Sequence, residues 1–142
     1  MAVITDIADA VTAELNSADF GVTFTAQRLY QPLFELADMK DLHVTVVPRG
    51  VAIHSGGRSH NHHDYQIDVA VQKKFDSESP VELDPLMDLV QAVADHFRLQ
   101  RLSSYPDAMW LKTENVPIYA QEHMEQLRQF TSIITFTFRV AR

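Results

Sequence analysis

Histidines gather in one short stretch of the chain, and imidazole is the side chain that most often binds metals in proteins. His60, His62, His63 and Asp64 lie within five residues of one another, and His54 precedes them. Imidazole and carboxylate groups are suitable ligands for zinc or nickel. Their spacing matches no HExxH motif, and the chain has no cysteine for a paired-cysteine motif. The four clustered residues are therefore the metal candidates, but we expect a solvated polar loop with no metal and no cofactor.

Other catalytic arrangements are not supported by the sequence. Ser103 and Ser104 lie in the segment RLSSYPD, which lacks the GxSxG context of an activated serine. Gly56 and Gly57 precede a polar segment, whereas a phosphate-binding loop leads into a helix. We therefore expect no catalytic residues and no enzymatic activity.

Four basic residues flank the histidine-rich stretch and the strand that we expect after it. Arg49 and Arg58 lie on either side of Gly50 and Gly56, and Lys73-Lys74 follows the alternating segment. If the sheet brings these residues together, they form a cationic spot for an acidic partner or a neighbouring copy. The alternative is that they are solvated strand ends.

The overall composition indicates one acidic domain spanning residues 1–142. Lys and Arg number 12 against 19 Asp and Glu, giving a net charge of −7, and 46% of the residues are hydrophobic. An acidic surface repels phosphate, so broad nucleic-acid binding is disfavoured. The N-terminal segment lacks the features of a signal peptide, and no apolar run is long enough to span a membrane.

Hydrophobic periodicity predicts two main helices and about four strands. The helices are expected at residues 3–15 and 84–98, the second with Asp84 as its N-cap and Pro85 at its first position. The strands are expected at residues 22–30, 42–47 (ending at Pro48), 65–73 and 129–140, with a possible short strand at 108–112 and a helical turn at 121–126. Residues 49–63 are expected to form a loop. The predicted fold class is α+β, with a mostly antiparallel sheet and both main helices on one face.

The last strand carries a polar face beside its apolar one. Thr135, Thr137 and Arg139 alternate there with Phe136 and Phe138. A long regular strand near a terminus can pair with the sheet of another chain if it lies at an edge. The alternative is a central strand whose backbone is satisfied internally.

Several segments together resemble a known family. They are ITDIADAVTAELN, TAQRLYQP, LHVTVVPR, DYQIDVAVQKK, DPLMDLVQAVADHF and RQFTSIITFTFRV, in this order along nearly the whole chain. In these packing patterns the chain resembles the tail terminator and tail-completion (neck) proteins of tailed bacteriophages. The resemblance implies a small structural protein that forms a hexameric ring on the tail tube, stops tube polymerisation and provides the surface for joining the head-side neck.

The resemblance also implies partners and a location. The partners are further copies of the chain, the tail tube protein and neck or connector proteins, while DNA passes through the lumen without specific binding. The location is the virion tail or neck, assembled in the cytoplasm of the bacterial host. No cofactor and no catalytic residue are carried over, and residues 49–63 would be a contact loop. The interface candidates are Arg49, Arg58, Lys73, Lys74, Thr135, Thr137 and Arg139.

Two other functions remain open at this point. One is a head–tail connector or head-closure protein of similar size, which the packing patterns barely separate from a terminator. The other belongs to a different class, a metal-binding protein or metal-dependent enzyme built on the histidine cluster.

Overall fold

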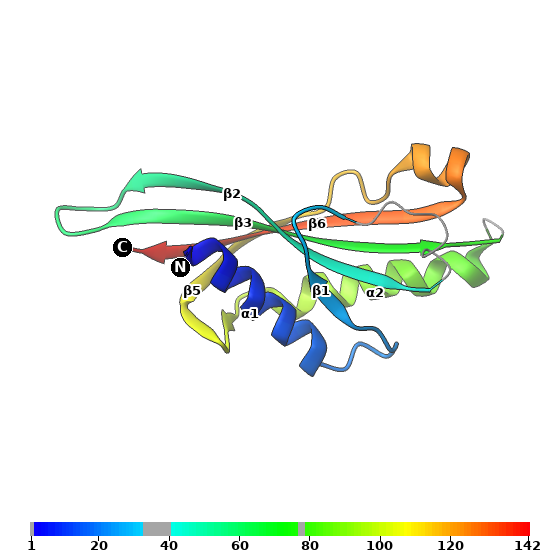
Figure 1. Ribbon diagram of the computed structural model, residues 1–142, viewed down its shortest axis with the longest axis horizontal. Helices are drawn as coiled ribbons and strands as arrows, with labels where there is room; N and C mark the ends of the chain where they lie inside the picture. Colours follow the sequence, from blue (N-terminus) through cyan, green and yellow to red (C-terminus); the bar gives the residue numbers. More distant parts are fainter. Residues whose placement is uncertain (1, 33–40, 77–78) are drawn as a thin grey trace.

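The computed structural model describes residues 2–32, 41–76 and 79–142, and Figure 1 shows their arrangement. A sheet runs along the length of the molecule, with α1 and α2 on one side of it. The elements in chain order are α1 (Val3–Ser17), β1 (Ala26–Arg28), β2 (His43–Ser55), β3 (Asn61–Lys74), α2 (Pro80–Phe97), β4 (Arg101–Leu102), β5 (Tyr105–Glu114), the π-helical turn η2 (His123–Leu127) and β6 (Gln129–Ala141).

The six strands are ordered β1-β2-β3-β6-β5-β4. β1 pairs with β2 in parallel, and the other neighbours are antiparallel. The α+β class is confirmed, but the expected count of about four strands is wrong and the sheet is mixed. The strands beyond the expected four are β4 and β5; β5 contains the possible strand at 108–112, whereas β4 has only two residues, too few for an alternating pattern to reveal.

The core lies between the sheet and the two α-helices. Ile67 and Val69 of β3 and Phe136 of β6 are fully buried there. The ring of Phe97, at the end of α2, lies 4.9 Å from that of Phe136. Full burial of an aliphatic or phenylalanine side chain contributes about 1.5–3 kcal/mol, so this layer supplies most of the hydrophobic stabilisation. We call the opposite side of the sheet, away from α1 and α2, the open face.

The helices are longer than predicted. α1 continues to Ser17, and α2 begins at Pro80, so Asp84 lies inside α2 and its predicted N-cap role is wrong. Ser79 occupies the N-cap position instead. Proline is tolerated in the first turn because its missing N–H would have no partner there. Pro80 occupies that position, whereas Pro85 lies inside the helix, so its predicted place at the first helical position is wrong as well. None of the described helices has the length and apolar character needed to cross a membrane.

The predicted strands changed mainly at their ends. The first is confined to β1, and the possible strand at 108–112 is the middle of the longer β5. The helical turn predicted at 121–126 corresponds to η2 with the residues before it, and the last strand agrees with β6. η2 packs against β6 on the open face, where His123 Nδ1 lies 2.8 Å from Thr131 Oγ1.

Candidate assembly surface

The stretch predicted as a loop, residues 49–63, is a β-hairpin formed by the ends of β2 and β3. β2 continues through Pro48 to Ser55, and Ser55 pairs with Asn61 across a turn at residues 56–60. The register shifts between Pro48 and Gly50, and such a bulge lets a strand continue past a proline. The prediction that the strand ends at Pro48 is therefore wrong. The hairpin projects at one end of the molecule (Figure 1).

The two arms of the hairpin differ in their surroundings. The β3 arm pairs with β6 up to His62 opposite Ala141, and Asn61 exchanges two backbone hydrogen bonds with Arg142. The β2 arm is the outer one, and all of residues 51–55 are exposed. The inner arm is thus held on both sides, whereas the outer arm is held on one.

The histidine cluster is divided by the alternation of the strand. His62 and Asp64 lie on the open face, whereas His63 lies on the other face and stacks on Tyr65 with ring centroids 6.0 Å apart. His60 lies in the turn, with its ring centroid 5.6 Å from that of His62. Among the residues that the structure describes, no three His, Cys, Asp or Glu side chains are grouped so that they could hold a metal ion.

Asp64 is the best-anchored residue of the cluster, and its partner is a predicted interface residue. Arg139 donates two hydrogen bonds to its carboxylate, of 2.7 Å from Nε and 3.0 Å from Nη2. His54 Nε2 lies 3.3 Å from the second carboxylate oxygen. The hydrogen bonds from Arg139 hold the pKa of Asp64 below its usual range, against the opposing effect of burial, and the charge of His54 adds to the lowering. Asp64 therefore acts as the acceptor of an ion pair at the base of the hairpin.

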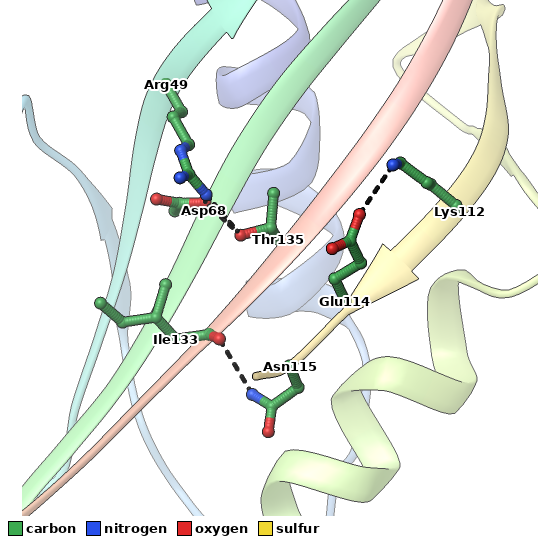
Figure 2. Close-up of polar contacts among 7 residues, drawn as sticks. All are labelled: Arg49, Asp68, Lys112, Glu114, Asn115, Ile133 and Thr135. Carbon is green, nitrogen blue, oxygen red and sulfur yellow. Dashed lines mark hydrogen bonds and ion pairs between the residues drawn. The ribbon is translucent and has the colours of Figure 1, made fainter. Parts of the chain in front are cut away.

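A second polar group on the open face surrounds Arg49, which lies at the bulge of β2 (Figure 2). Arg49 Nη1 donates to Thr135 Oγ1 at 3.1 Å and lies 3.6 Å from Asp68 Oδ1. The hydroxyl of Thr135 donates in turn to Asp68 Oδ1 at 2.7 Å. The group links β2, β3 and β6. Sequence reasoning missed Asp68, although its place on the polar face of an alternating strand was the available signal.

The same face continues onto β5. Lys112 Nζ lies 2.7 Å from Glu114 Oε1, and Asn115 donates to the carbonyl oxygen of Ile133 at 2.9 Å (Figure 2). The pKa of Glu114 is lowered by its hydrogen bond with Lys112. A hollow of about 550 Å³ lies between this segment and the Arg49 group, and Val116 at its rim is 89% exposed. Each of the three cations named on this face therefore has a carboxylate partner.

The predicted basic residues do not form one cationic spot. Arg58 lies in the hairpin turn, whereas Lys73 and Lys74 lie at the far end of β3, opposite Phe130 and Gln129. β3 has 14 residues and spans about 40 Å at the usual rise of a strand. The four residues are therefore separate features of the surface.

The last strand is internal. β6 lies between β3 and β5, which agrees with the central-strand alternative and not with a free edge. Thr135 and Thr137 are only 9% and 3% exposed. Arg139 is more accessible but is held by Asp64. Neither threonine is placed to meet a partner at a sheet edge.

Comparisons with known proteins show where this fold recurs. No protein-family model matches the sequence, and no curated protein is significantly similar to it. The fold is similar to that of a chain in the virion of a native gene transfer agent particle, with a TM-score of 0.64 and 17% identity, over 99% of this chain and 98% of that chain. A weaker likeness, with a TM-score of 0.42 and 15% identity, is to a sheath/tube terminator of an extracellular contractile injection system, over 100% of this chain and 57% of that one. At 17% identity the first likeness shows a shared fold, and the second is too weak to support an argument.

Proposed function

We propose that this protein is a structural tail component of a phage-like particle, a terminator whose copies form a six-membered ring on the tail tube. The ring would stop tube polymerisation and offer a surface for joining the neck. The observation that carries the proposal is the shared fold with a chain of a virion, which extends over 99% of this chain and 98% of the other. The packing patterns that resemble tail terminators point in the same direction.

The charges of the open face are consistent with such a role. The net charge is −7, and Arg49, Lys112 and Arg139 are each paired with a carboxylate. DNA is bound mainly through free cations that replace its counterions. A ring built from these subunits would therefore let DNA pass through its lumen without holding it.

The first test is the state of the purified protein. Multi-angle light scattering and negative-stain electron microscopy should show a closed ring of uniform size. A protein that stays monomeric at high concentration and does not bind tail tubes would refute the proposal.

The second test is deletion of the gene in a particle-producing host. Tails of uncontrolled length would support the terminator function. Tails of normal length that fail to join heads would instead assign the protein to the neck, as a connector or head-closure component.

A further inference from the structure

We propose that two open edges of the sheet form the complementary halves of a head-to-tail contact between copies of this chain. One half is the outer edge of β2 at residues 51–55, called here the outer β2 segment. The other is the outer edge of β5 at residues 111–114, called here the outer β5 segment. The inference rests on the proposed function only in taking a second copy as the partner.

The outer β2 segment has the properties of an edge that receives another strand. β1 covers β2 only at Val44–Val46, and Leu29 adds one backbone hydrogen bond to Val46. Beyond that point no described residue pairs with the outer side of β2. The segment reads VAIHS, with Val51 49% and Ile53 59% exposed. Free edges are usually blocked by lysine, proline or a bulge, and the proline and the bulge of β2 both lie before this segment.

The outer β5 segment lies at the opposite side of the sheet. β4 pairs with Tyr105 and Met109, and Trp110 N donates to the Gln100 carbonyl at 3.2 Å. In the described part of the chain, no strand pairs with β5 on this side beyond Trp110. Leu111 is 38% exposed at a register shift. This edge also offers backbone groups next to an apolar side chain.

A second copy of the chain fits both edges because the two edge strands run in opposite directions. β2 and β6 are both antiparallel to β3, and β5 is antiparallel to β6, so β2 and β5 are antiparallel to each other. Copies placed side by side in the same orientation would therefore bring the β2 edge of one copy and the β5 edge of the next together as antiparallel strands. Charge does not oppose this pairing, because residues 51–55 contain no Asp, Glu, Lys or Arg, and Lys112 of the outer β5 segment is paired with Glu114. A contact between unlike patches is head-to-tail and leads to rings when the rotation closes.

The register of the sheet gives this contact a stagger. Val51, Tyr65, Phe138 and Trp110 lie in one row across the four central strands. From this row the outer β2 segment runs toward the C-terminal end of β6, whereas the outer β5 segment runs toward its beginning. Joined copies would therefore be displaced along their strands, and closure of a sheet requires such a stagger.

Cysteine cross-linking tests the contact directly, because the chain has no cysteine. Ile53→Cys and Leu111→Cys proteins are treated with a short bis-maleimide, each alone and as a mixture. We expect covalent dimers in the mixture and a loss of at least roughly tenfold in dimer yield for either protein alone. Val81→Cys replaces Leu111→Cys or Ile53→Cys as the control, since Val81 is 84% exposed and lies on α2. Equal yields with Val81→Cys, or dimers with Ile53→Cys alone, would overturn the proposal.

An assembly assay separates this inference from the proposed function. Ile53→Lys is expected to raise the concentration for half-assembly by at least roughly tenfold, as a central apolar contact does when lost, while Val81→Lys leaves it unchanged. Circular dichroism checks that both variants are folded. If the Ile53→Lys protein still forms the same rings as the wild type, the edge contact is overturned but the terminator proposal stands. If Ile53→Lys abolishes the rings but deletion of the gene leaves tail length unchanged, the edge contact stands and the terminator proposal is overturned. A monomeric wild type overturns both.

Discussion

Replacing Leu99 with glycine should stabilise the protein, although it removes a large apolar side chain. Leu99 follows the C-cap of α2, Arg98, and has a φ of 59°, in the left-handed region. Glycine is the preferred residue at this position because it has no Cβ to meet the following carbonyl oxygen. The side chain is 80% exposed, so little burial is lost when it is removed.

The magnitude follows from two opposing effects. A non-glycine residue in the left-handed region costs roughly 1–2 kcal/mol. Glycine loses more backbone entropy on folding, which offsets about 0.5–1 kcal/mol of that gain. We therefore expect Leu99→Gly to raise the free energy of unfolding by about 0.5–1 kcal/mol, or Tm by roughly 2–4 °C at this chain length.

The assay is urea denaturation followed by far-UV circular dichroism and by the fluorescence of Trp110, the single tryptophan. Wild type and variant are compared at the same protein concentration, because assembly adds to the apparent stability. Leu99→Ala is the matched control, since it removes most of the side chain but keeps the Cβ, and it should not stabilise. Equal free energies of unfolding for Leu99→Gly and Leu99→Ala would refute the backbone argument.

Three further predictions follow from the core, the ion pair and the contact between α1 and β1. Phe97→Ala should lower the free energy of unfolding by about 3–5 kcal/mol in urea denaturation, because Phe97 is fully buried; a loss below 1 kcal/mol would contradict the packing. The stability difference between wild type and Asp64→Asn should shrink as the pH falls below Asp64's usual pKa of 3.8, because Arg139 lowers that pKa in the folded protein and protonation ends the ion pair. Denaturation at several acidic pH values tests this, and a difference unchanged in acid would contradict it. Asn16→Ala should cost about 1–2 kcal/mol in the same assay, because the Asn16 amide accepts from Ala26 N at 2.7 Å and donates to its carbonyl at 3.1 Å; an unchanged stability would show that this link is dispensable.

The central elements could be predicted from the sequence because one face of each is buried. β3 and β6 alternate cleanly, and the apolar stripes of α1 and α2 keep helical spacing. When one face of an element is buried, apolar residues recur along the sequence at the period of that helix or strand, so the element can be recognised from the sequence alone. The edge strand β4 is held by backbone pairing with the longer β5, and this leaves little trace in two residues. The first predicted strand, at residues 22–30, exists but pairs with β2 over only the three residues of β1.

The hairpin was misread for a related reason. Val51 and Ile53 alternate with Ala52 and His54, but both sides of this arm are exposed, so its pattern does not mark a buried face. The proline, glycines and histidines around it then indicated a loop. The Asp64–Arg139 pair was equally hidden, because 75 residues separate the two in sequence and only the register of β3 on β6 joins them.

The chemistry of the open face argues that copies meet along the edges of the sheet and not across this face. The polar groups around Arg49 and Asp64 are already satisfied within one chain. Covering them with an apolar surface would remove ion pairs from water, which costs several kcal/mol per ion unless new partners replace the water. The edges combine exposed Ile53 and Leu111 with strand backbone that no described residue pairs, and pairing there buries apolar area and forms hydrogen bonds together. Assembly along the edges would leave the charged face in water, with its ion pairs hydrated.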